Sequence, residues 1–264
     1  MIGFIGAGKM AEGMIAGILR TGGVPASIHA ADVNAERLAD LHRRTGIQTT
    51  TDNRAVAAVC KTLVLAVKPQ QIDAVCQALA PCIGSDHLVL SIAAGKRLER
   101  LGALLPQARM IRVMPNLACI VGEGMCVIAC GAHVTAADRD TAQKLLEGCG
   151  QVDELPEAQF DAVTALGGSG PAFFAWVLTE FARGAEAEGL SRTAALALAT
   201  QTMRGTARLL REKFPDPARL IEAVTSHRGT TAAGREVLEN EATAKVLRET
   251  IRSAARRSRE LGQA

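Results

Sequence analysis

The stretch Gly3–Met14, "GFIGAGKMAEGM", decides the fold of the first half of the chain. Its core, Gly6–Ala11, has the pattern G-x-G-x-x-A and joins the apolar run "IGFI" to a segment with helical spacing. In such a turn the first glycine allows the tight bend, the second lets the backbone approach a pyrophosphate, and the alanine lets helix and strand pack closely. The free N–H groups at the start of the helix favour phosphate. We therefore expect a dinucleotide site at Gly6, Ala7, Gly8, Lys9 and Met10.

An acidic residue stands where this pattern requires one. Asp32 ends the second predicted strand, "SIHAAD", about 20 residues beyond the glycine turn. A carboxylate there accepts hydrogen bonds from the adenosine ribose of NAD and repels the 2′-phosphate of NADP. It could instead cap the following helix, but Asn34 can do that. Arg37 and Lys9 leave NADPH open. The expected cofactor is NADPH or NADH, and Asp32 favours NADH.

Strand-like and helix-like segments alternate up to about residue 156, which indicates a parallel sheet with helices on its faces. Beyond that point the strand signal stops. We predict an α/β protein, with a Rossmann-type doubly wound parallel sheet in a domain over 1–156, followed by an all-helical oligomerisation domain over 157–264. Its segment "AALALAT" is apolar on all sides, and such helices are normally buried. The domain is too small to cover it, so we expect a homo-oligomer.

Two further predicted strands end in unusual residues. One is followed by Ala66, Val67, Lys68 and Pro69, and the other by Met114-Pro115-Asn116. Doubly wound sheets bind ligands at the carboxyl ends of their strands. The prolines also fit a simple loop. We take the four residues from Ala66 to Pro69 as cofactor-binding, and expect the amide of Asn116 to contact a nicotinamide or a substrate.

Composition excludes several classes of partner. Aromatic residues make up 3% of the chain and Tyr is absent, so a stacking platform for single-stranded nucleic acid is not expected. The net charge of +3 is too small to indicate a polyanionic partner, and the basic run near the C-terminus fits a solvated helix face. We predict a small-molecule substrate and no nucleic acid.

The cysteines and the N-terminus point to a cytoplasmic protein. None of the seven cysteines forms a C-x-x-C pair, so we predict no metal site and reduced structural thiols. The N-terminal "MIGFIGAGKM" lacks the basic region of a signal peptide. We find no stretch long enough to cross a membrane without charged or helix-breaking residues, and expect no membrane association.

Six segments, taken together and in this order, resemble pyrroline-5-carboxylate reductases: "GFIGAGKMA", "AVKP", "SIAAG", "RVMPN", "ALGGSGPAFF" and "VTS..GTT". The resemblance covers nearly the whole chain. It implies a Rossmann domain followed by helical domains that intertwine into a dimer, with dimers often assembling into larger rings. The implied reaction is hydride transfer from NAD(P)H to the C=N bond of 1-pyrroline-5-carboxylate, which gives L-proline. An iminium carbon is already electrophilic, so the reaction needs positioning more than a metal or a strong base.

The resemblance also assigns site residues. Within "SIAAG" we take Ala93 as cofactor-binding. The polar stretch "TSHRGTT", at 225–231, is expected to bind the substrate carboxylate through backbone N–H groups, with Thr231 near the ring nitrogen as the catalytic residue. Helix capping is the alternative role for Thr230 and Thr231. The expected substrate-binding residues are Asn116, Ser169, Gly170, Ser226, Gly229 and Thr230.

Two places depart from the family pattern. The family usually continues Thr-Pro after "MPN", where this chain has Leu117-Ala118, and it usually has Pro-Gly where this chain has His227-Arg228. Both lie in loops expected to meet nicotinamide or substrate. The alternatives are therefore a reductase of another cyclic imine or keto acid, and a non-catalytic NAD(P)-binding homologue. A β-hydroxyacid dehydrogenase is disfavoured because "GGSGPAFFAWVLTEF" contains no lysine.

Overall fold

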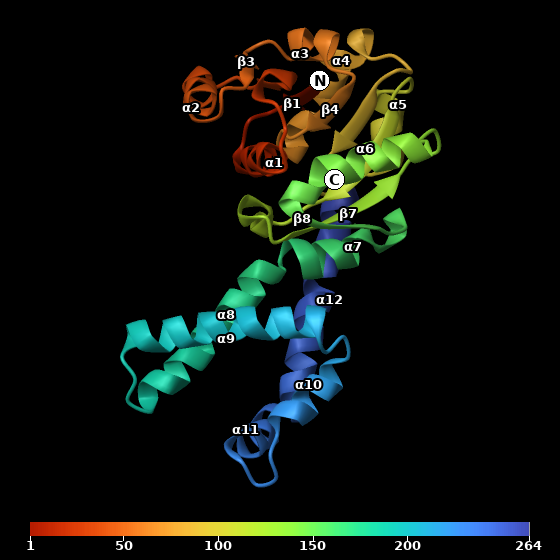
Figure 1. Cartoon of the computed structure of the whole chain (residues 1–264). Helices are drawn as coiled ribbons and strands as arrows, with labels where there is room; N and C mark the ends of the chain where they lie inside the picture. Colours follow the sequence, from red (N-terminus) through yellow and green to blue (C-terminus); the bar gives the residue numbers. More distant parts are fainter. Residues whose placement is uncertain (264) are drawn as a thin grey trace. The chain divides into compact units, whose positions relative to one another are not determined.

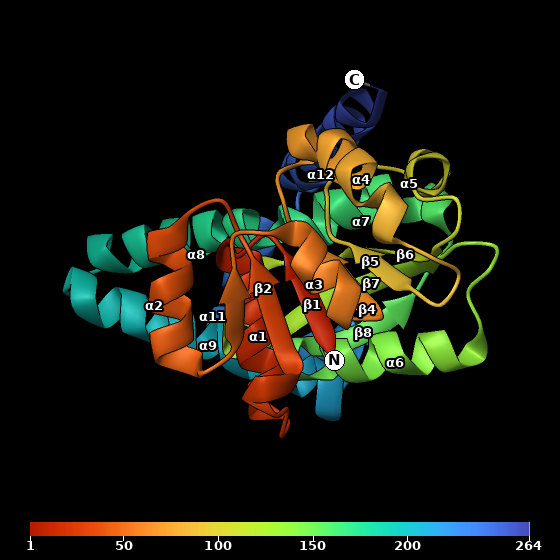
Figure 2. The same cartoon turned by 90° about the horizontal axis from the view of Figure 1, so that it is seen from above.

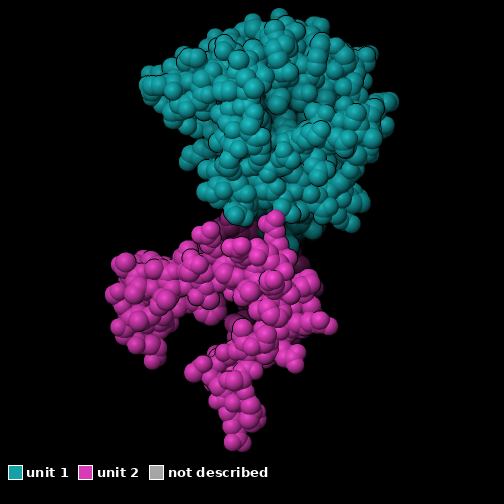
Figure 3. Space-filling model, viewed as in Figure 1, with its two compact units in different colours: residues 1–169, 254–264 teal, residues 170–253 magenta. Residues whose placement is uncertain are grey.

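The computed structural model describes residues 1–263. By their contacts the residues form two compact units, coloured separately in Figure 3. The first unit comprises residues 1–169 together with the C-terminal stretch from Ala254, and the second comprises Gly170–Ser253. The sheet ends before the boundary we predicted at residue 156, and the division between the compact units lies further on, after Ser169.

The first unit is built on one eight-stranded sheet with the order β3-β2-β1-β4-β5-β6-β7-β8. The strands are β1 (Ile2–Ile5), β2 (Ile28–Ala31), β3 (Gln48–Thr50), β4 (Thr62–Leu65), β5 (Leu88–Ser91), β6 (Arg109–Met114), β7 (Gly124–Cys130) and β8 (Gly150–Glu154). Chain order reverses between β1 and β4, which are parallel neighbours. This is the switch point at which open α/β sheets bind ligands.

One pair of strands departs from the predicted parallel arrangement. β6 and β7 are antiparallel, with Ile111 opposite Cys130, whereas β7 and β8 are parallel again. The link between β6 and β7 contains only the 3-10 turn η4 (Leu117–Val121). A parallel crossover needs a dozen or so residues and usually a helix, so this short link imposes the reversal. The sheet is otherwise the doubly wound one expected.

Helices cover both faces of the sheet, as Figure 2 shows from above. They are α1 (Lys9–Arg20), α2 (Ala35–Thr45), α3 (Asn53–Val59), α4 (Ile72–Leu79), α5 (Leu98–Leu104) and α6 (Ala136–Leu146). Side chains of α1, α2 and α6 share one buried cluster with Phe4 and Val64 of the sheet. Those of α3, α4 and α5 share another with Ile5 and Leu65. Because successive strand residues point to opposite faces, neighbours such as Phe4 and Ile5 serve different cores.

Local sequence signals explain where these helices begin. The side chain of Asn34 accepts a hydrogen bond from Arg37 N and caps α2. Thr135 and Asp138 form a reciprocal capping box at the start of α6. Such caps satisfy backbone N–H groups that have no partner within the helix. At α1 the N-cap is Gly8 and no side chain caps the helix, so its first N–H groups are left for another acceptor.

From residue 157 to residue 263 all the regular secondary structure is helical. It contains α7 (Phe160–Val163), a π-turn η7 (Thr164–Gly168), α8 (Gly170–Ala187), α9 (Arg192–Glu212), α10 (Pro217–Val224), α11 (Thr230–Leu238) and α12 (Glu241–Gln263). Figure 1 labels the six α-helices. Within the second unit α8 packs on α9, and α10 also contacts α9. This is the all-helical second part that the sequence predicted.

The second unit leaves large apolar side chains in solvent. On α8, Phe174 is 56% exposed and Trp176 is 63% exposed. Val237 on α11 and Val246 on α12 are exposed as well. This exposure agrees with the expectation that the helices need further apolar surface to cover them.

One apolar segment bears on the expectation that the protein has no membrane association. The helical run Glu157–Ala187 is long and apolar enough to cross a membrane by length and composition alone. Its glycines and Pro171 predict a break in the helix, but the chain passes through them in the π-turn and continues as α8. A single such helix is weak evidence for a membrane.

Candidate active site

The glycine turn lies at the switch point of the sheet. Gly6 follows β1 with φ +101°, a conformation that strongly favours glycine. A Cβ atom at Gly6 would also come within 2.8 Å of the carbonyl oxygen of Ala66. At Gly8 an added Cβ would meet no atom within 4 Å. The backbone above the N-terminus of α1 therefore faces open space, and its unpaired N–H groups suit a phosphate.

Asp32 ties the end of β2 to this turn. Its Oδ2 accepts a hydrogen bond from Ala7 N at 2.8 Å, and its Oδ1 accepts one from Asn34 N at 2.9 Å. Arg37 Nη1 lies 3.2 Å from Oδ2. Burial opposes ionisation of this carboxyl, but the two backbone hydrogen bonds and Arg37 outweigh it and lower its pKa. Asp32 is thus anionic at neutral pH and fixed beside the glycine turn.

A cavity of about 560 Å³ opens where the carboxyl ends of β4, β5 and β6 meet the start of α1. It brings together most of the first-unit residues that the sequence singled out: Gly8, Lys9, Met10, Ala66, Val67, Lys68, Pro69, Ala93, Asn116 and Ser169. Gly6, Ala7 and Asp32 do not line the cavity. They are connected to its lining through the glycine turn, in which Gly6 N donates to Ala31 O and Ala7 N donates to Asp32.

Asn116 is held within this cavity by the start of β7. Its Oδ1 accepts a hydrogen bond from Met125 N at 3.4 Å, and its carbonyl accepts one from Cys119 N at 3.1 Å. Its Nδ2 has no hydrogen-bond partner within residues 1–263. The amide can therefore donate to a ligand while its oxygen is held by the backbone.

The π-turn lines the cavity and was not predicted. Thr164 and Gly168 face it together with Ser169, whose N–H donates to Thr164 O at 2.9 Å across the wide turn. Single π-turns inside helices occur often at functional sites. The glycine pair at 167–168 is the sequence signal that could have located it. Ile92, Ala94, Met114, Pro115 and Leu117 also line the cavity and were not predicted as binding residues.

The remaining predicted residues belong to the second unit, and all except Gly170 lie in and near the turn between α10 and α11. Gly229 N donates to Ser226 O at 3.1 Å, and Gly229 is the N-cap of α11. No side chain caps this helix, so the structure does not bear out capping by Thr230 or Thr231. Both threonines lie in the first turn of α11, and Thr231 is half-buried. Gly170 is the first residue of α8.

One of the two departures from the family pattern has a structural signature in this turn. Arg228 has φ +55°, and it is the only residue other than glycine with a positive φ among those the structure describes. A larger residue in this conformation is uncommon. The turn therefore keeps a left-handed position although the glycine usual for the family is missing.

Comparison with known proteins places the chain in a family. Residues 157–261 match the family model described as pyrroline-5-carboxylate reductase dimerisation, and residues 1–95 match NADP oxidoreductase coenzyme F420-dependent. The chain is 41% identical to a pyrroline-5-carboxylate reductase of Methanosarcina acetivorans over 99% of its own length and 98% of the relative's. The chain belongs to the pyrroline-5-carboxylate reductase family. The resemblance inferred from the six segments is thereby confirmed.

Solved structures of this family agree over the whole chain. A pyrroline-5-carboxylate reductase from Coxiella burnetii superposes with a TM-score of 0.95 at 31% identity, covering 100% of this chain and 98% of that one. A pyrroline carboxylate reductase from Plasmodium falciparum, solved with NADP bound, has a TM-score of 0.87 at 25% identity, covering 99% and 97%. The predicted fold, a Rossmann domain followed by the helical dimerisation domain of this family, is confirmed.

The first unit fits a nicotinamide dinucleotide. The open space above Gly8 and the uncapped start of α1 suit a pyrophosphate. Asp32 lies at the ribose position of the motif, and both Gly8 and Asn116 line the cavity. Lys68 is an exposed cation on its wall. The cavity lining carries two cations, Lys9 and Lys68, and is otherwise mostly apolar, as a nicotinamide site requires.

Proposed function

We propose that this protein is a pyrroline-5-carboxylate reductase, which reduces the C=N bond of 1-pyrroline-5-carboxylate to give L-proline in proline biosynthesis. The single observation that supports this most strongly is the similarity to named reductases along the entire chain, in both units. The reaction adds a hydride to the imine carbon and a proton to the nitrogen. A bound NAD(P)H supplies the hydride; the chain's own residues bind and orient the reactants.

In this proposal the cofactor site consists of the glycine turn, Asp32, the strand end Ala66–Pro69, Ala93 and Asn116. The N–H groups at the start of α1 bind the pyrophosphate. Asn116 is suited to hold the carboxamide or the substrate, because its oxygen is already occupied by Met125 N and its Nδ2 is left to donate. Ser169 and Gly170, at the junction of the π-turn and α8, are proposed to contact the substrate.

We further propose that the turn before α11 binds the substrate carboxylate. Ser226 and Gly229 form the turn, and the uncapped N–H groups of the first turn, with Thr230, are available to an anion. Thr231 is assigned the catalytic role: its hydroxyl donates a hydrogen bond to the ring nitrogen or relays a proton to it through water.

For the cofactor we propose a preference for NADH. Asp32 is ionised and held by two backbone N–H groups, so it cannot easily move away from a 2′-phosphate. Arg37 is already paired with the same carboxylate, which reduces its availability to that phosphate. Repulsion between the negatively charged carboxylate and a negatively charged 2′-phosphate beside it disfavours NADPH.

We propose an NAD(P)-binding domain over 1–156 and a helical domain over 157–264, through which two copies form a homodimer. Such dimers could associate into a larger ring. The exposed Phe174 and Trp176 on α8 supply the apolar surface that a stable interface needs. Burial of this face between two copies also accounts for the apolar run Glu157–Ala187 without a membrane. The seven free thiols favour a cytoplasmic location.

Steady-state oxidation of NADH and NADPH in the presence of pyrroline-5-carboxylate tests the function. We expect substrate-dependent oxidation of at least one cofactor with formation of proline. A matched series with other cyclic imines and with keto acids addresses the departures at Leu117-Ala118 and His227-Arg228. A higher kcat/KM for one of those substrates would replace the proposed one, and cofactor binding without any turnover would support a non-catalytic homologue.

A further inference from the structure

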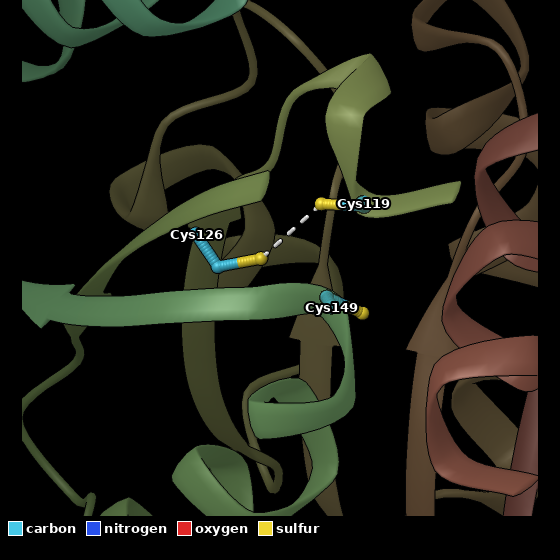
Figure 4. A group of neighbouring side chains, drawn as sticks. All are labelled: Cys119, Cys126 and Cys149. Atoms are coloured by element: carbon cyan, nitrogen blue, oxygen red, sulfur yellow. Dashed lines mark hydrogen bonds between the residues drawn. The ribbon is translucent and has the colours of Figure 1, made fainter. Parts of the chain in front are cut away.

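Three buried cysteines from separate segments meet in the core of the first unit. Cys119 lies in η4, Cys126 in β7 and Cys149 in the 3-10 turn η5 (Glu147–Cys149). Their three Sγ atoms all lie within 4.8 Å of one another, and those of Cys119 and Cys126 are 3.6 Å apart (Figure 4). Among the described residues this is the one group of three or more cysteine, histidine or acidic side chains with such spacing.

Close backbone packing holds the three segments together. An added Cβ at Gly124, at the start of β7, would lie 2.4 Å from Cys119 Sγ and 2.8 Å from the carbonyl oxygen of Cys149. Any larger residue there would push η4 and the start of β8 away from β7. The sulfur atoms are therefore placed by packed backbone rather than by mobile loops, which is the arrangement that a preorganised binding site needs.

Helix α1 closes the cluster from a second side. Arg20, at the end of α1, donates a hydrogen bond to the carbonyl of Gly148 at 2.9 Å and another to that of Ile120 at 3.3 Å. These carbonyls belong to the residues adjacent to Cys149 and Cys119. One guanidinium thus links η4 to η5 and brings a positive charge to the neighbourhood of the thiols.

We propose that Cys119, Cys126 and Cys149 form a binding site for one thiophilic divalent d10 metal ion, such as Zn²⁺. Thiolate sulfurs bind Zn²⁺ at about 2.3 Å, which sets neighbouring sulfurs about 3.8–4.0 Å apart in a tetrahedral or trigonal site. The spacing observed needs shifts of less than about 1 Å to match it. Soft thiolate ligands select such ions over Mg²⁺ or Ca²⁺.

Charge and protons balance in this site. Three thiols lose three protons on binding a divalent ion, which leaves a complex with one net negative charge. Arg20 offsets that charge from the adjoining carbonyls. The ligands are spread over 119–149 without a C-x-x-C pair, so no sequence motif announces the site.

The cluster lies directly behind the candidate active site. Cys119 N donates to Asn116 O, and Met125, next to Cys126, donates to Asn116 Oδ1. An effect of metal on turnover could therefore arise through Asn116 alone. The test must accordingly measure the metal and its ligands rather than activity.

The experiment uses the full-length protein, reduced under anaerobic conditions and stripped of metal. Equilibrium dialysis against Zn²⁺ or Cd²⁺, followed by metal analysis, should give one tightly held ion per chain. Cd²⁺ should produce a thiolate-to-metal charge-transfer band that Zn²⁺ removes by competition. X-ray absorption of the zinc-loaded wild type should show three sulfur neighbours at about 2.3 Å.

Variants assign the ligands. Cys119→Ala, Cys126→Ala and Cys149→Ala should each abolish the stoichiometric ion and the band. Cys76→Ala should keep both, since Cys76 is equally buried but lies in the core on the opposite face of the sheet. The proposal is overturned if wild type retains no ion, if X-ray absorption shows nitrogen and oxygen neighbours only, or if Cys126→Ala and Cys76→Ala behave alike.

Discussion

Oδ2 of Asp32 accepts a hydrogen bond from the backbone N–H of Ala7 at 2.8 Å, so the carboxylate that follows β2 is fixed to the glycine turn that follows β1. The carboxylate has two tasks in this account. It fixes the turn that receives the pyrophosphate, and it sets the electrostatic field at the ribose. These tasks separate in experiments, because the first affects both cofactors and the second distinguishes them.

Asp32→Ala should shift cofactor use toward NADPH. Removal of the fixed negative charge also frees Arg37 from its ion pair. We expect the ratio of kcat/KM for NADH to that for NADPH to fall at least about tenfold, equivalent to about 1.4 kcal/mol. The control is Asp40→Ala, because Asp40 is an α2 carboxylate that pairs with Arg43 and Arg44 instead. An unchanged ratio in Asp32→Ala would remove the proposed basis for NADH preference.

Asp32 should also make stability depend on pH in acid. Its folded-state pKa is lowered, so its contribution is complete above the unfolded value of about 3.9 and disappears as pH falls through the lower folded value. Urea midpoints of wild type and Asp32→Asn should therefore differ most near neutral pH and converge below about pH 4. A difference that grows toward acid pH would contradict the sign of this shift.

Substitutions of the two glycines in the turn should have different effects, one on folding stability and the other on cofactor affinity. Gly6→Ala places a Cβ against the Ala66 backbone at φ +101°, and should cost about 1–3 kcal/mol of folding free energy. In Gly8→Ala the added methyl meets no protein atom, but alanine is a poorer N-cap for α1 than glycine, so the cost in folding free energy should stay at or below about 1 kcal/mol. The methyl group occupies the space above α1, and the Kd for cofactor should rise at least about tenfold. Equal cofactor affinity in Gly8→Ala and wild type would show that the pyrophosphate does not bind there.

Thr231→Ala should reduce kcat strongly while leaving cofactor binding intact. Loss of a group that donates to the reacting nitrogen typically costs about 100-fold or more. Thr141→Ala, at an exposed position on α6, is the matched control and should behave as wild type. Turnover of Thr231→Ala close to that of wild type would refute the catalytic assignment, whatever the cofactor affinity.

Trp176→Glu should weaken self-association through the helical domain. A charge at this exposed apolar position on α8 would be buried without a partner in a dimer. Light scattering coupled to gel filtration should show a dimer or larger species for wild type and a smaller one for the variant. Val24→Glu, an equally exposed apolar site in the first unit, should leave the mass unchanged. A variant that keeps the wild-type mass would place the interface elsewhere.

Features encoded by neighbouring residues could be predicted from the sequence. The glycine turn, the cap at Asn34 and the capping box of Thr135 and Asp138 each depend on residues a few positions apart. The roles expected at the strand ends Ala66 and Asn116 follow from the rule that doubly wound sheets bind ligands at the carboxyl ends of their strands. These local signals were enough to identify Gly8, Lys9, Met10, the strand end Ala66–Pro69 and Asn116 among the residues that line the cavity.

Other features depend on contacts distant in sequence. β3, with only three polar or half-buried residues, has no hydrophobic signal and forms because β2 offers it an edge. The π-turn at Thr164–Gly168 has the sequence of a helix break because glycine is a poor helix former. The meeting of Cys119, Cys126 and Cys149 needs three segments to fold together. No pattern within one segment could show it.

The central claim is tested most directly by following the hydride. The wild-type protein is incubated with pyrroline-5-carboxylate and NADH carrying deuterium at the transferable position of C4, and the product is analysed by mass spectrometry. We expect L-proline with one deuterium on the former imine carbon, formed in proportion to the cofactor oxidised, and the same product at a lower rate with deuterated NADPH. No labelled proline from either cofactor, with the protein folded and the cofactor bound, would contradict the claim.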